Sequence, residues 1–180
     1  MTQQYKLIFT GPVGAGKTTA IAAVSDTQVV STDTKATDMT MQRKDTTTVA
    51  MDYGTLRLDD KTQVHLYGTP GQERFNFMWD ILTEGGIGLL LLIDNTRDNP
   101  LGDLRFYTKA FDEFIKTTQL VVGITRMDES RRFKIEDYTQ ALADLNLRAP
   151  VFEVDAREKA DVSVMIKTLL CSLEESSHNG

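Results

Sequence analysis

Residues 11–18 read Gly-Pro-Val-Gly-Ala-Gly-Lys-Thr, and this stretch decides the fold class of the chain. It matches the pattern GxxxxGK[ST], and it follows Tyr5–Thr10, an apolar run suited to a buried strand. Glycines in such a loop let backbone N–H groups turn toward a phosphate, and the N-terminus of the following helix adds positive potential. The stretch therefore predicts a phosphate-binding P-loop between a strand and a helix.

The chemistry of this loop assigns roles to its last residues. Lys17 is expected to reach the β- and γ-phosphates of a nucleotide, and the Thr18 hydroxyl is expected to bind Mg²⁺. The residues predicted to line the phosphates are Gly11, Val13, Gly14, Ala15, Gly16, Lys17, Thr18 and Thr19. The plain alternative is a glycine-rich turn with an exposed lysine, but strand, loop and helix all fall where phosphate binding needs them.

Apolar patterns along the rest of the chain alternate between strands and helices. Strands are predicted at Tyr5–Thr10, Gly88–Asp94, Leu120–Thr125 and Val151–Val154, with a hairpin formed by Val49–Leu58 and Thr62–Tyr67. Helices are predicted at Leu101–Thr117, Ile135–Leu145 and Val162–Leu173. This alternation predicts an α/β fold in which helices cover both faces of a mostly parallel sheet.

Length and composition favour a single domain. The chain has 180 residues, of which 41% are hydrophobic, and this is enough for one sizeable core. We predict one domain over residues 1–180, with a flexible tail from about residue 174. The net charge of −6 comes without a basic run, so neither nucleic acid nor an anionic membrane is favoured as a partner.

The sequence gives no signal for a membrane or an oxidising compartment. Thr2 stands where N-myristoylation needs glycine, the final SSHNG is not a prenylation motif, and the longest apolar stretch, Leu89–Ile93, is far shorter than a membrane span. The single cysteine, Cys171, falls in an apolar helical pattern and is predicted to be a core residue. We expect a cytoplasmic protein without a lipid anchor.

A second motif narrows the class of P-loop protein. Residues 68–75 read Gly-Thr-Pro-Gly-Gln-Glu-Arg-Phe, which resembles the DTAGQERF motif of the Ras-like small GTPases, and Gly71 through Phe75 match it residue for residue. The resemblance implies that the Gly71 N–H senses the γ-phosphate and that Gln72 orients the attacking water. It also implies a P-loop NTPase fold of three layers, α/β/α, with a six-stranded sheet, an antiparallel second strand and five helices.

A third stretch resembles the first switch of the same family. Residues 46–53 read Thr-Thr-Thr-Val-Ala-Met-Asp-Tyr and are similar to the family's TTIGVEF. The resemblance places Thr48 at the threonine whose hydroxyl meets Mg²⁺, although three consecutive threonines leave the alignment open by one residue. It implies Gln72, Lys17 and Thr48 as catalytic residues and Thr18 and Thr48 as metal ligands.

Two short motifs resemble the family's base-binding loops. Thr125-Arg126-Met127-Asp128 is similar to [NT]KxD, with arginine in place of lysine, and Asp155-Ala156-Arg157 is a weak form of SAK. The Asp128 carboxylate would accept hydrogen bonds from guanine N1–H and its exocyclic amine, and Ala156 would offer its N–H to guanine O6. Because adenine does not present two such donors, the resemblance implies selectivity for GTP and GDP. A helix cap or loop charge is the structural alternative for Asp128.

The chain also departs from the family pattern. Gly68 stands where Ras-like proteins generally have an aspartate that helps to hold Mg²⁺, and a bacterial branch typified by MglA shares this loss. Asp52 or Asp94 is a candidate replacement, and each is also an ordinary acid at the end of a strand. Arg43 and Lys44 could offer a cation to the γ-phosphate, or simply solvate a long loop.

The resemblance as a whole implies a slow GTPase of the MglA type that acts as a switch. Its expected partners are an effector and an activating protein, for which a roadblock-type dimer is a candidate. Two other functions stay open at this point. One is a catalytically silent nucleotide-binding scaffold, and the other is a P-loop kinase, for which Arg131-Arg132 is the single pair of adjacent arginines at hand.

Overall fold

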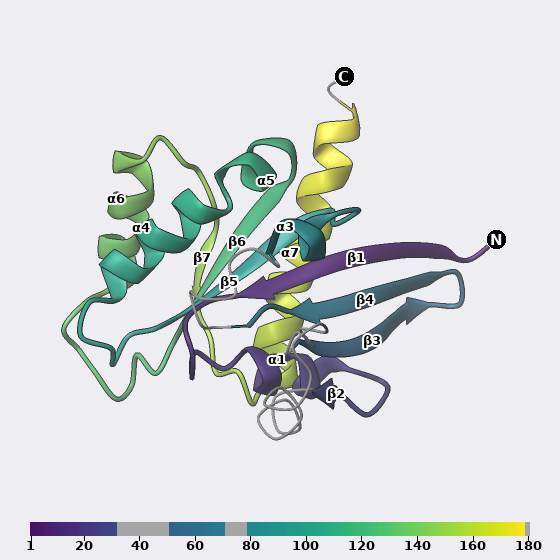
Figure 1. Cartoon of the computed structure of the whole chain (residues 1–180), viewed down its shortest axis with the longest axis horizontal. Coiled ribbons are helices and arrows are strands. Elements are labelled where there is room, and N and C mark those ends of the chain that lie inside the picture. The colour runs from purple at the N-terminus through teal and green to yellow at the C-terminus, as the bar shows by residue number, and fades with distance from the viewer. Residues whose placement is uncertain (32–50, 71–78, 179–180) are drawn as a thin grey trace, which may run out of the picture.

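The computed structural model of the chain describes residues 1–31, 51–70 and 79–178 (Figure 1). Its strands are β1 Gln3–Thr10, β2 Val30–Ser31, β3 Asp52–Asp59, β4 Thr62–Gly68, β5 Gly88–Asp94, β6 Gln119–Thr125 and β7 Val151–Glu153. Its helices are α1 Lys17–Val24, α3 Trp79–Thr83, α4 Pro100–Ala110, α5 Asp112–Thr117, α6 Ile135–Asp144 and α7 Lys159–His178. The predicted alternation of strands and helices is confirmed.

One mixed sheet forms the middle layer, in the order β2-β3-β4-β1-β5-β6-β7. The strands β4, β1, β5, β6 and β7 run parallel to one another, and β3 pairs antiparallel with β4. β5 reads GLLLLID and is buried along its whole length, because it lies in the middle of the sheet with helices on both faces. The carboxyl ends of the parallel strands therefore meet at one edge, where the P-loop begins.

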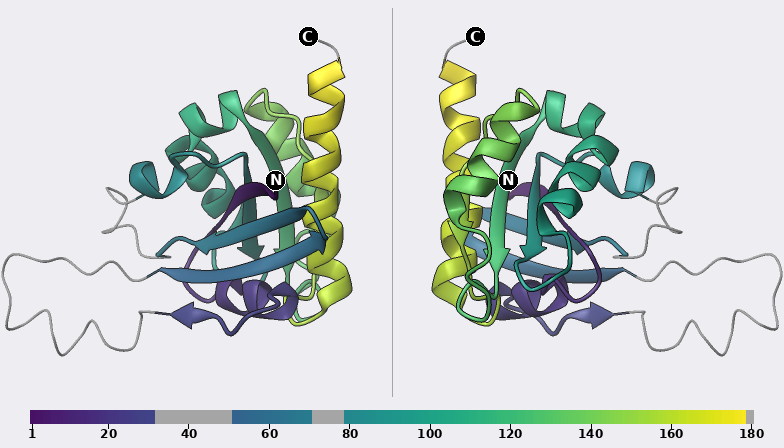
Figure 2. Two further views of the ribbon diagram at one scale, coloured as in Figure 1. Left: turned by 90° about the vertical axis from the view of Figure 1, so that its right-hand side faces the viewer. Right: turned by 90° about the vertical axis from the view of Figure 1, so that its left-hand side faces the viewer.

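Helices cover the sheet on two faces, as Figure 2 shows for α7 on one side and α4 on the other. Alternate residues of β5 supply the two cores: Leu90 and Leu92 pack with α1 and α7, and Leu89, Leu91 and Ile93 pack with α4 and α6. The three-layer α/β/α prediction is confirmed. The described part of the chain contains no helix that is both long and apolar enough to cross a membrane.

Three details of the fold differ from the sequence expectations. The sheet has seven strands rather than six, because β2 adds two residues that pair antiparallel with Asp52 and Tyr53. The helix predicted at Leu101–Thr117 is divided into α4 and α5 at Phe111, whose backbone leaves helical values while its ring stacks on Trp79 with centroids 5.0 Å apart. α7 continues to His178, so most of the residues expected to form a tail are helical.

The prediction for Cys171 is wrong, since this residue is exposed. On α7 the buried stripe contains Met165, Ile166 and Leu169. Cys171 follows Leu169 by two positions, which turns its side chain by about 200° around the helix. An apolar helical pattern therefore predicted the helix correctly but assigned this residue to the wrong face.

Candidate functional site

The P-loop has the backbone conformation that its glycines allow. Gly11 has φ 144° and approaches β5 closely, because a Cβ at this position would lie 2.1 Å from the Leu92 carbonyl oxygen. Gly16 has φ 104° and immediately precedes α1. Both positions disfavour any other residue, since side chains make left-handed backbone conformations costly. The predicted strand, loop and helix arrangement is confirmed.

Lys17 lies across the loop rather than in solvent. Its side chain is 7% exposed, and its Nζ donates to the carbonyl oxygens of Gly11 at 2.7 Å and Pro12 at 2.8 Å. An ammonium group held over a turn of backbone amides is the arrangement that binds phosphate oxygens in a P-loop. The lysine is therefore placed to exchange these carbonyls for the oxygens of a nucleotide.

The chain that leads into the Gly71 motif is tied to β1, beside the P-loop. The Thr69 N–H donates to the Phe9 carbonyl at 2.9 Å, and the Thr69 and Thr10 hydroxyls are hydrogen bonded at 2.8 Å. The Trp79 indole N–H donates to the Pro70 carbonyl at 3.3 Å. Several sequence-predicted site residues lie outside the described residues, namely Arg43, Lys44, Thr48, Gly71, Gln72, Glu73, Arg74 and Phe75.

A cavity of about 660 Å³ opens beside the P-loop, at the carboxyl ends of β6 and β7. It brings together three segments that are far apart in the sequence. The lining residues are Ala15, Gly16, Thr19, Thr125, Arg126, Met127, Asp128, Glu129, Glu153, Val154, Asp155, Ala156, Arg157 and Asp161. The two sequence motifs predicted to bind a base therefore face one cavity together with the phosphate loop.

Contacts between the segments fix the shape of this cavity. The Thr125 hydroxyl donates to the Ala15 carbonyl at 3.1 Å, which joins the end of β6 to the P-loop. A Cβ at Gly16 would lie 2.9 Å from the Cβ of Ala156, so both residues must be small for the loops to pack. Thr125 and Ala156 thus have structural roles at the positions where the sequence predicted base contacts.

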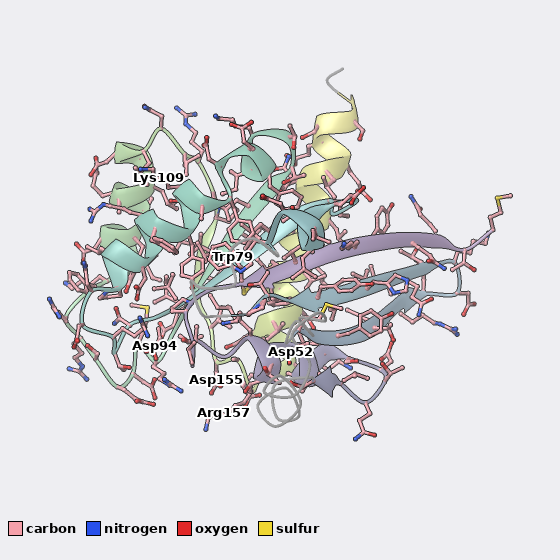
Figure 3. The ribbon with its side chains drawn as sticks, viewed as in Figure 1. Asp52, Trp79, Asp94, Lys109, Asp155 and Arg157 are labelled. Carbon is pink, nitrogen blue, oxygen red and sulfur yellow. The ribbon has the colours of Figure 1, made fainter. Side chains whose placement is uncertain are left out.

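The rim of the cavity carries an ion pair between Asp155 and Arg157 (Figure 3). The guanidinium donates to both carboxylate oxygens, at 2.9 and 2.7 Å, and these hydrogen bonds lower the pKa of Asp155 to about 2. The Asp155 N–H donates in turn to the Asp161 carboxylate in the first turn of α7, so the loop is fastened at both ends.

Arg126 is held by a partner that the sequence did not reveal. Its backbone is in the left-handed region at φ 57°, and its guanidinium donates to Asp94 Oδ2 at 2.5 Å. The other Asp94 oxygen accepts from the Thr96 N–H and hydroxyl, at 2.8 and 2.6 Å. Asp94 is buried and fully engaged with these groups, so it fixes the direction in which Arg126 leaves β6.

A second polar contact holds the loop that carries Asp128. Asn95 follows β5 and donates from its side chain to the Ser130 carbonyl at 2.8 Å, while its Oδ1 accepts from the Tyr138 hydroxyl at 2.5 Å. Burial raises the pKa of Tyr138, so its hydroxyl keeps the proton that it donates. Sequence reasoning missed Asn95 and Tyr138. The available signal was an asparagine directly after a buried strand and a tyrosine on the apolar face of a helix.

Comparisons with known proteins give one matching family model and several similar proteins, and two of these names mention a nucleotide. A family model described as "Conserved hypothetical ATP binding protein" matches residues 9–173. The GTP-binding protein YPT1 of Saccharomyces cerevisiae is 25% identical over 177 residues, covering 96% of this chain and 80% of that protein. The Ras-related protein RABE1e of Arabidopsis thaliana is 27% identical over 176 residues, covering 94% and 75%. The Ras-related protein SEC4 of Saccharomyces cerevisiae is 26% identical over 133 residues, covering 72% and 61%. These similarities support a place in the Ras-like superfamily.

Asp94→Asn tests whether the contact with Arg126 holds the loop that carries Asp128. The substitution removes the charge that orients the guanidinium, and we expect nucleotide to dissociate about 10-fold faster, which corresponds to the loss of roughly one hydrogen bond to a charged group. The matched control is Asp103→Asn, which removes a carboxylate from a surface pair with Arg97. Stopped-flow release of a fluorescent nucleotide measures both, and equal release rates in the two variants would contradict the assignment.

Proposed function

The chain belongs to the family of conserved hypothetical ATP binding proteins, and from that premise we propose that it binds guanine nucleotide with Mg²⁺, hydrolyses GTP slowly and acts as a nucleotide-dependent switch. The observation that carries the proposal is the single cavity that joins the P-loop to Asp128 and to residues 155–157. The proposed phosphate and base sites would be connected there at the carboxyl ends of parallel strands, where open α/β sheets bind their ligands.

The choice of guanine over adenine rests on Asp128. Asp128 is one of the residues that line the cavity, as is Arg126, while the contacts of Asn95 and Asp94 hold its loop in place. A carboxylate accepts two hydrogen bonds from the Watson–Crick edge of guanine, whereas adenine would leave it without donors. The family description names ATP, and the similar proteins include one that is named as GTP-binding. Asp128 in this cavity favours GTP over ATP.

Asp128→Asn tests the base assignment directly. The amide donates where the carboxylate accepted, so we expect weaker GDP binding and a shift of preference toward xanthosine nucleotides. The control is Glu129→Gln, because Glu129 is the neighbouring carboxylate of the same cavity. Competition of GTP, XTP and ATP against a fluorescent guanine nucleotide gives the order of affinities. Equal affinity of the parent protein for ATP and GTP would reject guanine selectivity while leaving nucleotide binding intact.

The proposed hydrolysis uses groups placed around the γ-phosphate. Lys17 would neutralise charge on the β- and γ-phosphates, and Gln72 and Thr48 would orient water and metal. Thr18 and Thr48 are the residues proposed to hold Mg²⁺, which when bound would offset negative charge on the phosphates. Val13 is 57% exposed on the rim of the loop, where an external arginine would approach. These features favour slow turnover by the isolated chain.

Single-turnover hydrolysis tests the enzymatic part of the proposal. We expect a rate at or below about 10⁻³ s⁻¹, since unassisted sites of this kind run near 10⁻⁴ s⁻¹, and a further decrease in Gln72→Leu. Thin-layer or ion-exchange separation of GDP from GTP over hours measures it. A rate above about 1 s⁻¹ would contradict control by a partner, and no hydrolysis at all would favour the silent scaffold.

The proposed partners are an effector and a GTPase-activating protein, with a roadblock-type dimer as candidate for the second, as in the MglA branch. A P-loop kinase finds less support, because Arg131 and Arg132 are not among the residues that line the cavity and Arg132 instead donates to the Asp98 carbonyl.

The location of Trp79 supports the switch. It is buried and stacked on Phe111, and its N–H reaches the carbonyl of Pro70, the residue that precedes Gly71.

Trp79 is the only tryptophan in the sequence, so its fluorescence tests the switch without a label. We expect different emission with GDP and with a non-hydrolysable GTP analogue, because a γ-phosphate contact at Gly71 would act on the neighbouring Pro70. In Gly71→Ala this difference should vanish while GDP binding remains. Identical spectra of the parent protein in both nucleotide states would contradict the switch.

A further inference from the structure

The carboxylate of Asp52 lies against the metal-binding end of the P-loop. Its Oδ2 accepts a hydrogen bond from the Thr18 hydroxyl at 2.5 Å, although the two residues are 34 positions apart in the sequence. Asp52 is only 6% exposed at the beginning of β3. A threonine hydroxyl whose proton points to a carboxylate keeps its lone pairs for a cation, so the two groups can act on one ion together.

Gly68 faces Asp52 across the β3–β4 hairpin, where the two residues are paired in the antiparallel register. The backbone of Gly68 is not in the left-handed region, so its conformation does not require glycine. The available space favours glycine, because a Cβ on Gly68 would lie 3.1 Å from the Asp52 Cβ, 3.2 Å from Asp52 Oδ2 and 3.1 Å from the Ile21 Cδ1, so these side chains would have to shift. Two carboxylates at these facing positions would also repel each other. An aspartate therefore fits at position 52 or at position 68, but not readily at both.

Asp94, the other candidate carboxylate, is hydrogen bonded to other groups. It binds Arg126 and Thr96 at the end of β5, and Figure 3 shows it well separated from Asp52. Within residues 1–31, 51–70 and 79–178 no group of three or more acidic, histidine or cysteine side chains forms a ready-made metal cluster. Mg²⁺ fits such a setting, because it is commonly bound through one or two carboxylates together with substrate phosphates and water.

We propose that Asp52 is the acidic group of the Mg²⁺ site and that Gly68 is the space that admits it. This inference rests on the proposed function, in that the ion is bound with the nucleotide phosphates. Compared with the Ras-like pattern, the carboxylate and the glycine have changed places. Asp52 on β3 supplies the carboxylate, and Gly68 on β4 is the facing glycine. Thr18 and Asp52 hold the ion from the protein side, and the donor set of a hydroxyl and a carboxylate suits a hard cation.

Mn²⁺ titration of the GDP-loaded protein, followed by electron paramagnetic resonance, tests the assignment without using turnover. We expect Asp52→Asn to weaken Mn²⁺ binding about 10- to 100-fold, the range found when a supporting metal partner is lost. GDP release from this variant should lose most of its acceleration by EDTA. The matched control, Asp59→Asn at the other end of β3, should bind Mn²⁺ like the parent protein.

The exchange between the two strands predicts a rescue. The double variant Asp52→Gly/Gly68→Asp should recover Mn²⁺ affinity to within about threefold of the parent, whereas Gly68→Asp alone should not improve it. Recovery also shows that the hairpin folds, which removes misfolding as an explanation for the loss in Asp52→Asn. Unchanged Mn²⁺ affinity in Asp52→Asn, or no recovery in the double variant, would overturn the proposal. If the parent protein bound no nucleotide, the proposed function would fail instead.

Discussion

The close approach of the P-loop to the ends of the central strands is the constraint on which the rest of the site depends. Gly11 passes so near the Leu92 carbonyl that no side chain fits between them, and the Ala15 carbonyl accepts the Thr125 hydroxyl from β6. The loop is thereby fixed against β5 and β6 before any ligand binds. Ala15 and Gly16 of the loop and Thr19 of α1 also line the cavity, so the proposed phosphate and base sites share one wall.

Much of the fold was predictable because local patterns determine it. A strand buried on both faces must be apolar throughout, and a P-loop must carry glycine where the backbone is left-handed or crowded. The elements that sequence reasoning missed are those without a pattern of their own. β2 has two residues, too few to show alternation, and α3 has five. The break at Phe111 arises because its ring packs on Trp79, a tertiary contact that no helical periodicity contains.

The candidate site also contains residues that a local sequence pattern identifies and residues that only tertiary contacts reveal. Residues in contiguous motifs, such as Lys17 and Asp128, could be proposed from the sequence, and the structure brings the segments that carry them to one cavity. The pairings of Arg126 with Asp94 and of Thr18 with Asp52 join residues more than 30 positions apart. The sequence offered Asp52 and Asp94 as equal candidates for one role. The structure distinguishes them, because Asp52 accepts a hydrogen bond from Thr18 of the P-loop, whereas Asp94 binds Arg126.

The nucleotide that the purified protein retains shows whether this cavity selects guanine over adenine. Purified protein can be denatured in the presence of EDTA and the released nucleotide identified by ion-exchange chromatography and quantified per chain. We expect GDP or GTP at up to one equivalent, because the Asp128 carboxylate would accept the two hydrogen bonds that guanine offers. Release of ADP or ATP in place of guanine nucleotide would contradict it.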